Sequence, residues 1–188
     1  MKKLESESLP KLKTTLASSG LLLPELSVCA SVSAGERAPD ILKQCIIDDN
    51  VLSKPSFPSR LKIWEKLKDR YKFDIGDDIF PVWWQMIGHS DTTDLAQIAV
   101  LRWAQFDLLL RFLWMSVYLP RKNTDVSIKS LDVIGFVGNV KGPSEARRFF
   151  LNRSASVQAR IAQHFLLILR DCGAARGKMK KDLLPIPI

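Results

Sequence analysis

Residues 95–119 read LAQIAVLRWAQFDLLLRFLWMSVYL, a strongly apolar run of 25 residues. Arg102, Asp107 and Arg111 interrupt it, and its longest uncharged part is the eight residues 112–119. A membrane span needs about 20 predominantly apolar residues, and each central charge costs about 2.5–3.5 kcal/mol. Asp107 and Arg111 stand four residues apart, a spacing that allows them to pair on a helix surface. We therefore expect a soluble protein with a long central helix over 93–119, about 40 Å if unbroken at 1.5 Å per residue.

Upstream of this run, apolar residues recur at helical spacing. The pattern predicts short helices after Pro24 and after Pro39, a helix from Ser59 to Tyr71, and a short helical segment around the Trp83–Trp84 pair. All five tryptophans fall on apolar helical faces, which favours packing over base stacking. No β-rich run precedes residue 180, so the expected fold class is all-α.

Charge divides the chain where the central run ends. Residues 1–119 carry 15 Lys/Arg and 15 Asp/Glu, whereas residues 120–188 carry 13 Lys/Arg and five Asp/Glu, so the second part holds the whole net charge of +8. The breaker sequence PRKNT at 120–124 coincides with this change. We predict two small helical lobes, an N-terminal bundle over 1–119 and a basic lobe over 120–188. Such a concentrated positive field favours a polyanionic partner, nucleic acid first and acidic lipid second.

The basic lobe has the pattern of a winged helix-turn-helix. Helices are expected over 128–140, 143–150 and 154–171, with a turn at 151–153 and a basic extended arm after Gly173. In that motif the helix after the turn enters the major groove and the wing lies along phosphates. An ordinary bundle helix with a solvated polar face shows the same pattern and stays an alternative. The predicted DNA-binding residues are Arg147, Arg148, Arg153, Ser154, Ser156, Gln158, Arg160, Lys178, Lys180 and Lys181.

Catalytic and metal-binding patterns are missing from the sequence. The three cysteines, Cys29, Cys45 and Cys172, form no Cys-x-x-Cys pair, and the two histidines are remote from them. A phosphate loop is also missing, because the Gly135-x-x-Gly138 spacing lacks a flanking strand and a Lys-Ser/Thr ending. We expect a non-enzyme without metal or cofactor. Reduced cysteines and the lack of a signal-peptide pattern in the first 20 residues favour the cytoplasm.

Several segments resemble the BrxA family, small helical proteins of the bacterial BREX anti-phage systems. The resemblance rests on SGLLLPE at 19–25, IIDDNVLSK at 46–54, Arg70-Tyr71, and the helix 154–173 with its Asp-Cys-Gly ending, and it spans about residues 15–177. Ala155 and Ala174-Ala175 depart from it, since Thr and Leu-Leu are expected there. The resemblance implies a two-lobed all-α protein that binds double-stranded DNA beside a methyltransferase, an ATPase and other BREX components. Family members have also been labelled inner-membrane proteins and likened to the antitermination factor NusB.

The leading hypothesis is therefore a non-enzymatic accessory protein that binds double-stranded DNA mainly through phosphates. One alternative is an assembly adaptor whose basic lobe docks on an acidic protein of the defence complex. Another is NusB-like binding of RNA by the helical lobe. Membrane attachment ranks last because the charge belongs to one lobe and the apolar run is interrupted.

Overall fold

The apolar run 95–119 does not form one straight helix. The computed structural model describes residues 14–32, 39–74, 79–124, 126–142 and 144–185. Within it the run divides into α5 (Thr92–Phe106), α6 (Leu108–Leu113) and the π-helical turn η1 (Trp114–Tyr118). The break falls at Asp107, whose backbone is extended (φ −104°, ψ 98°). The Asp107 carboxylate accepts the backbone N–H of Leu110 at 3.0 Å and so caps the N-terminus of α6.

Asp107 also lies inside the protein and not on a helix surface. It is 4% exposed, and no ion pair joins it to Arg111. Instead, its Oδ2 accepts the Thr14 hydroxyl at 2.7 Å and the Trp103 indole N–H at 3.2 Å. A buried carboxylate needs such donors to offset its lost hydration. At the break, the Asp107 carboxylate thus links Thr14, at the start of the described chain, to Trp103, near the end of α5.

Four helices precede α5: α1 (Leu23–Val32), α2 (Pro39–Ile47), α3 (Phe57–Tyr71) and α4 (Phe80–His89). α3 begins slightly earlier than expected, because its N-cap is Ser56, whose hydroxyl accepts the Ser59 N–H at 3.4 Å. Aromatic rings at the end of α3 and in α4 form one cluster, with Phe73 in contact with the rings of Tyr71, Phe80 and Trp84. The packing role predicted for the tryptophans is confirmed for four of them, since Trp64, Trp83, Trp84 and Trp103 are buried.

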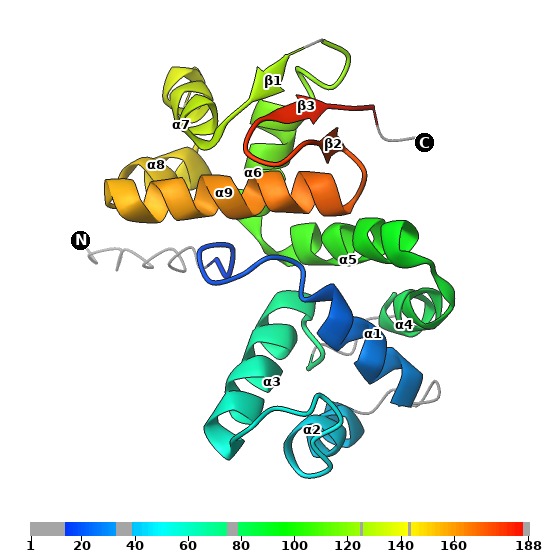
Figure 1. Cartoon of the computed structure of the whole chain (residues 1–188). Coiled ribbons are helices and arrows are strands. Elements are labelled where there is room, and N and C mark those ends of the chain that lie inside the picture. The colour runs from blue at the N-terminus through cyan, green and yellow to red at the C-terminus, as the bar shows by residue number, and fades with distance from the viewer. Residues whose placement is uncertain (1–13, 33–38, 75–78, 125, 143, 186–188) are drawn as a thin grey trace, which may run out of the picture.

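The elements after η1 are β1 (Ser127–Ile128), α7 (Ser130–Asn139), α8 (Glu145–Leu151), α9 (Ala155–Asp171), β2 (Ala175–Arg176) and β3 (Lys181–Leu183). The strands form an antiparallel sheet in the order β1-β3-β2 (Figure 1). β1 and β2 precede residue 180 and were not expected, because two-residue strands carry no alternation pattern. Helices otherwise dominate the described residues, which confirms the all-α class. Pro143 and residues 186–188, also assigned from sequence, lie outside the described residues.

A strap of residues 14–21 runs between distant elements. His164 of α9 hydrogen-bonds the backbone carbonyl of Leu16 through Nδ1 at 2.7 Å, and the Leu16 side chain is fully buried. From α3, Arg70 donates to the carbonyls of Ser19 and Gly20, and the Tyr71 hydroxyl donates to the carbonyl of Leu21. The strap therefore joins α9, the Asp107 break and α3 into one packed unit.

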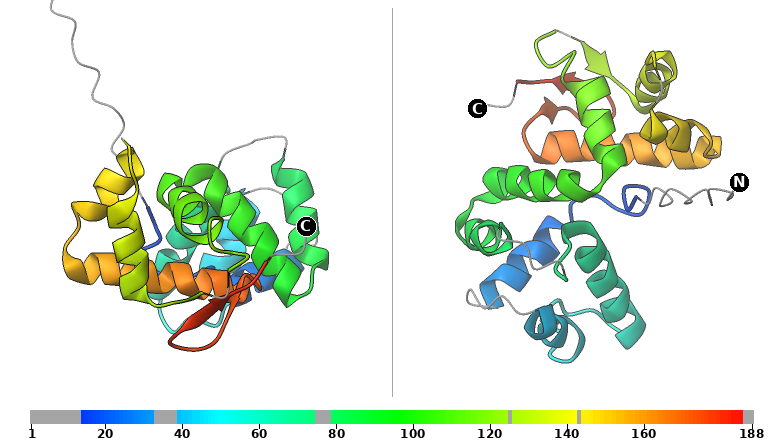
Figure 2. Two further views of the ribbon diagram at one scale, coloured as in Figure 1. Left: turned by 90° about the horizontal axis from the view of Figure 1, so that it is seen from above. Right: turned by 180° about the vertical axis from the view of Figure 1, so that it is seen from behind.

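The two halves of the chain meet along α5. Figure 2 shows α5 between the α1–α4 group and α9, and residue contacts join α5 to α1, α3, α4 and α9. α6 and η1, which precede residue 120, contact α8 and α7 respectively. The boundary at residues 119/120 stays a prediction. Among the described residues, no helix combines the length and apolarity that crossing a bilayer requires.

Candidate nucleic-acid interface

A three-residue turn, 152–154, joins α8 to α9, close to the predicted 151–153. Ser144 is the N-cap of α8, and its hydroxyl accepts the Arg147 N–H at 3.2 Å. The Gln158 amide closes the turn by donating to the carbonyls of Leu151 (3.1 Å) and Arg153 (2.8 Å). Gln158 therefore holds the start of α9 in place, and its amide nitrogen is already used within the protein.

Arg147 is half-buried, and its guanidinium is bonded within the protein. Its Nε donates to the carbonyl of Val137 at 3.1 Å, and its Nη2 donates to the carbonyl of Gly138 at 2.8 Å. These carbonyls end α7, where the helix dipole is negative and a cation is favourable. Arg147 thus fastens α8 to the C-terminus of α7.

Lys181 is the second predicted contact that the structure turns inward. Only 2% of it is exposed, and its ammonium donates to the carbonyls of Gly177 and Lys178 in the turn between β2 and β3. Burial lowers the pKa of this ammonium. Gly177 has φ 105°, and a Cβ added there would lie 2.3 Å from the Lys180 carbonyl oxygen. A buried lysine and a required glycine together fix the shape of the hairpin tip.

The remaining predicted residues are exposed: Arg148, Arg153, Ser154, Ser156, Arg160, Lys178 and Lys180. The serine hydroxyls of 154 and 156 lie 3.1 Å apart at the start of α9. None of the five cations pairs with a described carboxylate. Two acids of this segment have other partners, since Asp171 pairs with Arg170 and Asp182 accepts the Ser127 hydroxyl. The described part of the basic segment thus presents uncompensated positive charge on α8, α9 and the hairpin tip.

Arg153 has an additional contact that sequence reasoning missed. Its guanidinium lies 4.0 Å from the ring centroid of Phe149, a cation–π distance. Three further exposed cations without a described carboxylate partner, Lys129, Lys141 and Arg176, lie in the same segment and were not in the predicted set. Their charge was the available signal, and Arg176 also lies in the basic arm that was expected after Gly173.

The three cysteines are free thiols, and Cys45 is half-buried. Cys29 and Cys172 are buried, and burial raises the pKa of Cys29 to about 12 and that of Cys172 to about 11. At neutral pH both thiols stay protonated and weakly nucleophilic. Neither has the environment of an activated cysteine.

Comparison with known proteins gives a fold likeness and a family. The chain is similar to the crystal structure of an uncharacterized protein from Magnetospirillum magneticum, with a TM-score of 0.66 and 18% sequence identity over 95% of this chain and 88% of that chain. At this identity the likeness concerns the fold. No curated protein matches the chain. The family model named BrxA matches residues 10–188, nearly the whole sequence, and the chain therefore belongs to the BrxA family.

Proposed function

We propose that this protein binds double-stranded DNA without catalysing a reaction, as an accessory protein in the bacterial cytoplasm. The BrxA family indicates a component of a BREX phage-defence system. The observation that carries DNA binding is the set of five exposed cations without carboxylate partners on α8, the α8–α9 turn, α9 and the β2–β3 tip. A partner with a dense row of negative charges, such as the phosphate backbone, would compensate them.

The order of elements supports a winged arrangement on DNA. A helix pair with a short turn is followed directly by the β2–β3 hairpin, whose central strand β3 also pairs with β1. In such proteins the second helix meets the groove and the hairpin meets phosphates. Ser154, Ser156 and Arg160 would then lie nearest the groove, and Lys178 and Lys180 would contact the backbone. The proposal leaves out Arg147, Gln158 and Lys181, because each of these side chains already donates to two backbone carbonyls.

Salt dependence tests this mode of binding. Each neutralised phosphate contributes about −0.9 to the slope of log K against log salt concentration, so five contacts give a slope of about −4.5. We expect this slope in a fluorescence-anisotropy titration of duplex DNA. A slope near zero would contradict phosphate binding. Stronger competition by structured RNA than by duplex would favour the RNA alternative.

Variants in which basic residues are replaced by glutamate test which surface binds DNA. Arg148→Glu with Arg160→Glu should lower duplex affinity at least about 100-fold, because two favourable contacts become repulsive. Lys43→Glu with Lys62→Glu is the matched control, since both lysines are exposed on α2 and α3. Equal losses in the two double variants would place the interface elsewhere.

A specific observation favours a second candidate function, an adaptor that binds a protein through an apolar surface outside the basic lobe. On α5 and η1, Leu101 is 68% exposed and Met115 is 58% exposed. Both line a small, mainly apolar groove with Val100, Ala104, Arg111 and Trp114. Exposed apolar side chains that cluster mark protein contacts. Co-purification with another BREX component that survives nuclease and is lost in Leu101→Ser with Met115→Ser would support an adaptor role.

A further inference from the structure

The tip of the β2–β3 hairpin carries an apolar side chain between two lysines. Met179 is 91% exposed, the largest exposed fraction among the large apolar residues that the structure describes. Lys178 and Lys180 flank it in the chain, and both are exposed without a described carboxylate partner. A single exposed apolar residue is ordinary on a protein surface, whereas this one lies between two cations that the proposed DNA contact includes.

The backbone that carries Met179 is held in one shape. The buried Lys181 ammonium donates to the carbonyls of Gly177 and Lys178, which directly precede Met179 in the chain. The strand that follows the tip, β3, is the central strand of its sheet and pairs with both β1 and β2. In the left view of Figure 2 the hairpin (red) lies at the edge of the molecule, beyond α9. The side chain is therefore presented on a fixed base, so little backbone freedom is lost when a partner covers it.

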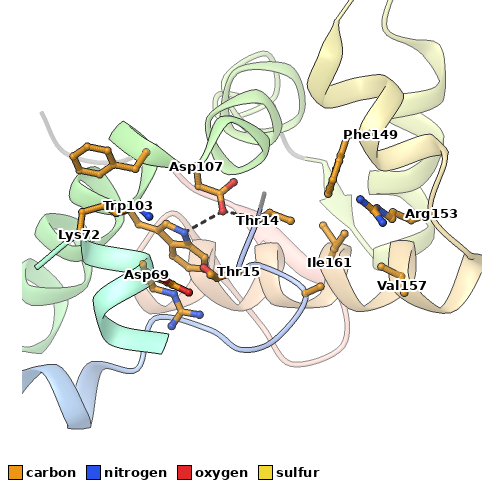
Figure 3. A pocket seen from close by; sticks show the side chains of 13 residues that line it. Thr14, Thr15, Asp69, Lys72, Trp103, Asp107, Phe149, Arg153, Val157 and Ile161 are labelled. Carbon is orange, nitrogen blue, oxygen red and sulfur yellow. Dashed lines mark hydrogen bonds between the residues drawn. The ribbon is translucent and has the colours of Figure 1, made fainter. Parts of the chain in front are cut away.

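Phe149, which also lies beside a predicted DNA contact, is not free in this way. It is half-buried and lines a pocket of about 580 Å³ between the α8–α9 turn, the strap and the ends of α3 and α5 (Figure 3). Figure 3 shows Phe149 and Arg153 together at one end of the pocket and Trp103 toward the other. The Arg153 guanidinium lies 4.0 Å from the centroid of the Phe149 ring and covers one of its faces. Phe149 is therefore used within the protein, whereas Met179 is open to a bound duplex.

We propose that Met179 enters the minor groove of bound DNA as a wedge between two base pairs, unstacks them and bends the duplex. Proteins that bend DNA in this way insert Met, Leu, Ile or Phe side chains between base steps. Methionine suits this role because its unbranched side chain adapts to the shape of the gap. The minor groove is about 6 Å wide, so Lys178 and Lys180 can reach phosphates at its borders while Met179 contacts the base pairs. This inference rests on the proposed binding of double-stranded DNA and adds bending to it.

The lysines and the methionine have different parts in this contact. The lysines supply an attraction to phosphates that is independent of sequence and is weakened by salt. Unstacking a base step costs free energy, and burial of the methionine side chain together with the added contacts of a bent duplex offsets that cost. Because pyrimidine–purine steps such as TA unstack most easily, the wedge gives a preference among sequences without any hydrogen bond to a base.

Bending and local unstacking of a duplex test the wedge with the full chain. The probe is a short duplex with a central TA step and a donor and an acceptor dye at its two ends, and a second duplex carries 2-aminopurine beside that step. We expect energy transfer between the ends to rise on binding, with a bend of about 20–90°, and 2-aminopurine fluorescence to rise as its base unstacks. A duplex with a central A-tract should bind at least about threefold more weakly, because A-tracts resist this deformation.

Variants at the tip assign both signals to the methionine. Met179→Ala should abolish the bend and the unstacking, yet keep the salt dependence of binding, because both lysines stay. Met179→Leu should retain the bend, since leucine is also found as a wedge. Leu131→Ala is the matched control and should change neither signal, because Leu131 is 77% exposed but lies on α7, outside the hairpin. Circular dichroism checks that each variant is folded.

Failure of the wedge can be told apart from failure of the proposed function. Duplex binding with the expected salt slope, but without bending or unstacking, would overturn the wedge alone. Bending that persists in Met179→Ala, or equal effects of Met179→Ala and Leu131→Ala, would also overturn it. Absence of duplex binding by the unmodified chain would overturn the proposed function, and the wedge with it.

Discussion

The buried arginines of the helices α1–α5 differ from the exposed arginines of the basic segment 120–188. In the first, Arg70 and Arg102 are 0% and 1% exposed, lie over aromatic rings and donate to backbone carbonyls. In the second, Arg148, Arg153 and Arg160 are exposed. The difference shows that counting charged residues in the sequence locates a basic region but does not tell which of its cations lack a partner within the protein. What separates the two kinds of cation is whether a backbone carbonyl lies within reach of the donors.

The largest expected effect is on the buried arginines. Arg70→Ala should lower the free energy of unfolding by about 3–4 kcal/mol, because it empties a buried space and leaves strap carbonyls without donors. Urea denaturation measures this loss. Arg148→Ala is the control and should change stability by less than about 0.5 kcal/mol. Similar losses in both variants would remove the distinction between the two classes of arginine.

The second-largest effect on stability is expected at the tip of the β2–β3 hairpin. Gly177→Ala should lower stability by about 1–3 kcal/mol, because it combines φ 105° with a Cβ 2.3 Å from the Lys180 oxygen. Gly135→Ala is the matched change within α7, where a Cβ meets nothing within 4 Å, and it should stabilise by up to about 1 kcal/mol. Thermal unfolding compares the two. If Gly177→Ala left the stability unchanged, the backbone of the β2–β3 hairpin tip would be able to rearrange around the added Cβ.

Adjacent lysines separate a structural cation from a binding cation. Lys181→Met should lower stability by about 1–2 kcal/mol, since two carbonyls lose their donor. Lys180→Met should leave stability unchanged and reduce the DNA salt slope by about 0.9. Denaturation and salt titrations of both variants measure these effects. The reverse pattern would show that Lys181 and not Lys180 contacts phosphate.

The smallest effect concerns the α8–α9 turn. Gln158→Ala should cost about 1 kcal/mol, because it removes donors to the carbonyls of Leu151 and Arg153. Its effect on duplex affinity should be smaller than that of Arg160→Gln, measured at one salt concentration. A larger effect would restore Gln158 as a base-reading residue.

Much of the fold could be predicted from the sequence. Helical spacing and caps located most helices and the turn before α9, because those signals act within a few residues. The break at Asp107 was missed, since the donor from Thr14 comes from 93 residues away. An Asp within an apolar run was the one local signal for that cap.

The candidate site was less predictable than the fold. The exposure of Arg148 and Arg160 could be predicted, because Arg148 lies near the end of α8 and Arg160 lies away from the apolar residues of α9, such as Ile161 and Phe165. The inward roles of Arg147 and Lys181 did not, because they depend on carbonyls that α7 and the hairpin bring into reach. The pocket lined by Phe149 and Trp103 could not be predicted from the sequence either, because its lining residues come from five segments that are separate in the sequence.

The strap has a consequence for how the protein is made. Leu16 leaves the ribosome early, yet its partner His164 is 148 positions later. Domains generally fold during synthesis from the N-terminal end, and contacts between distant residues form late. The contacts of the strap with α3 and Asp107 can therefore form before its contact with α9, which must wait until His164 has been synthesised.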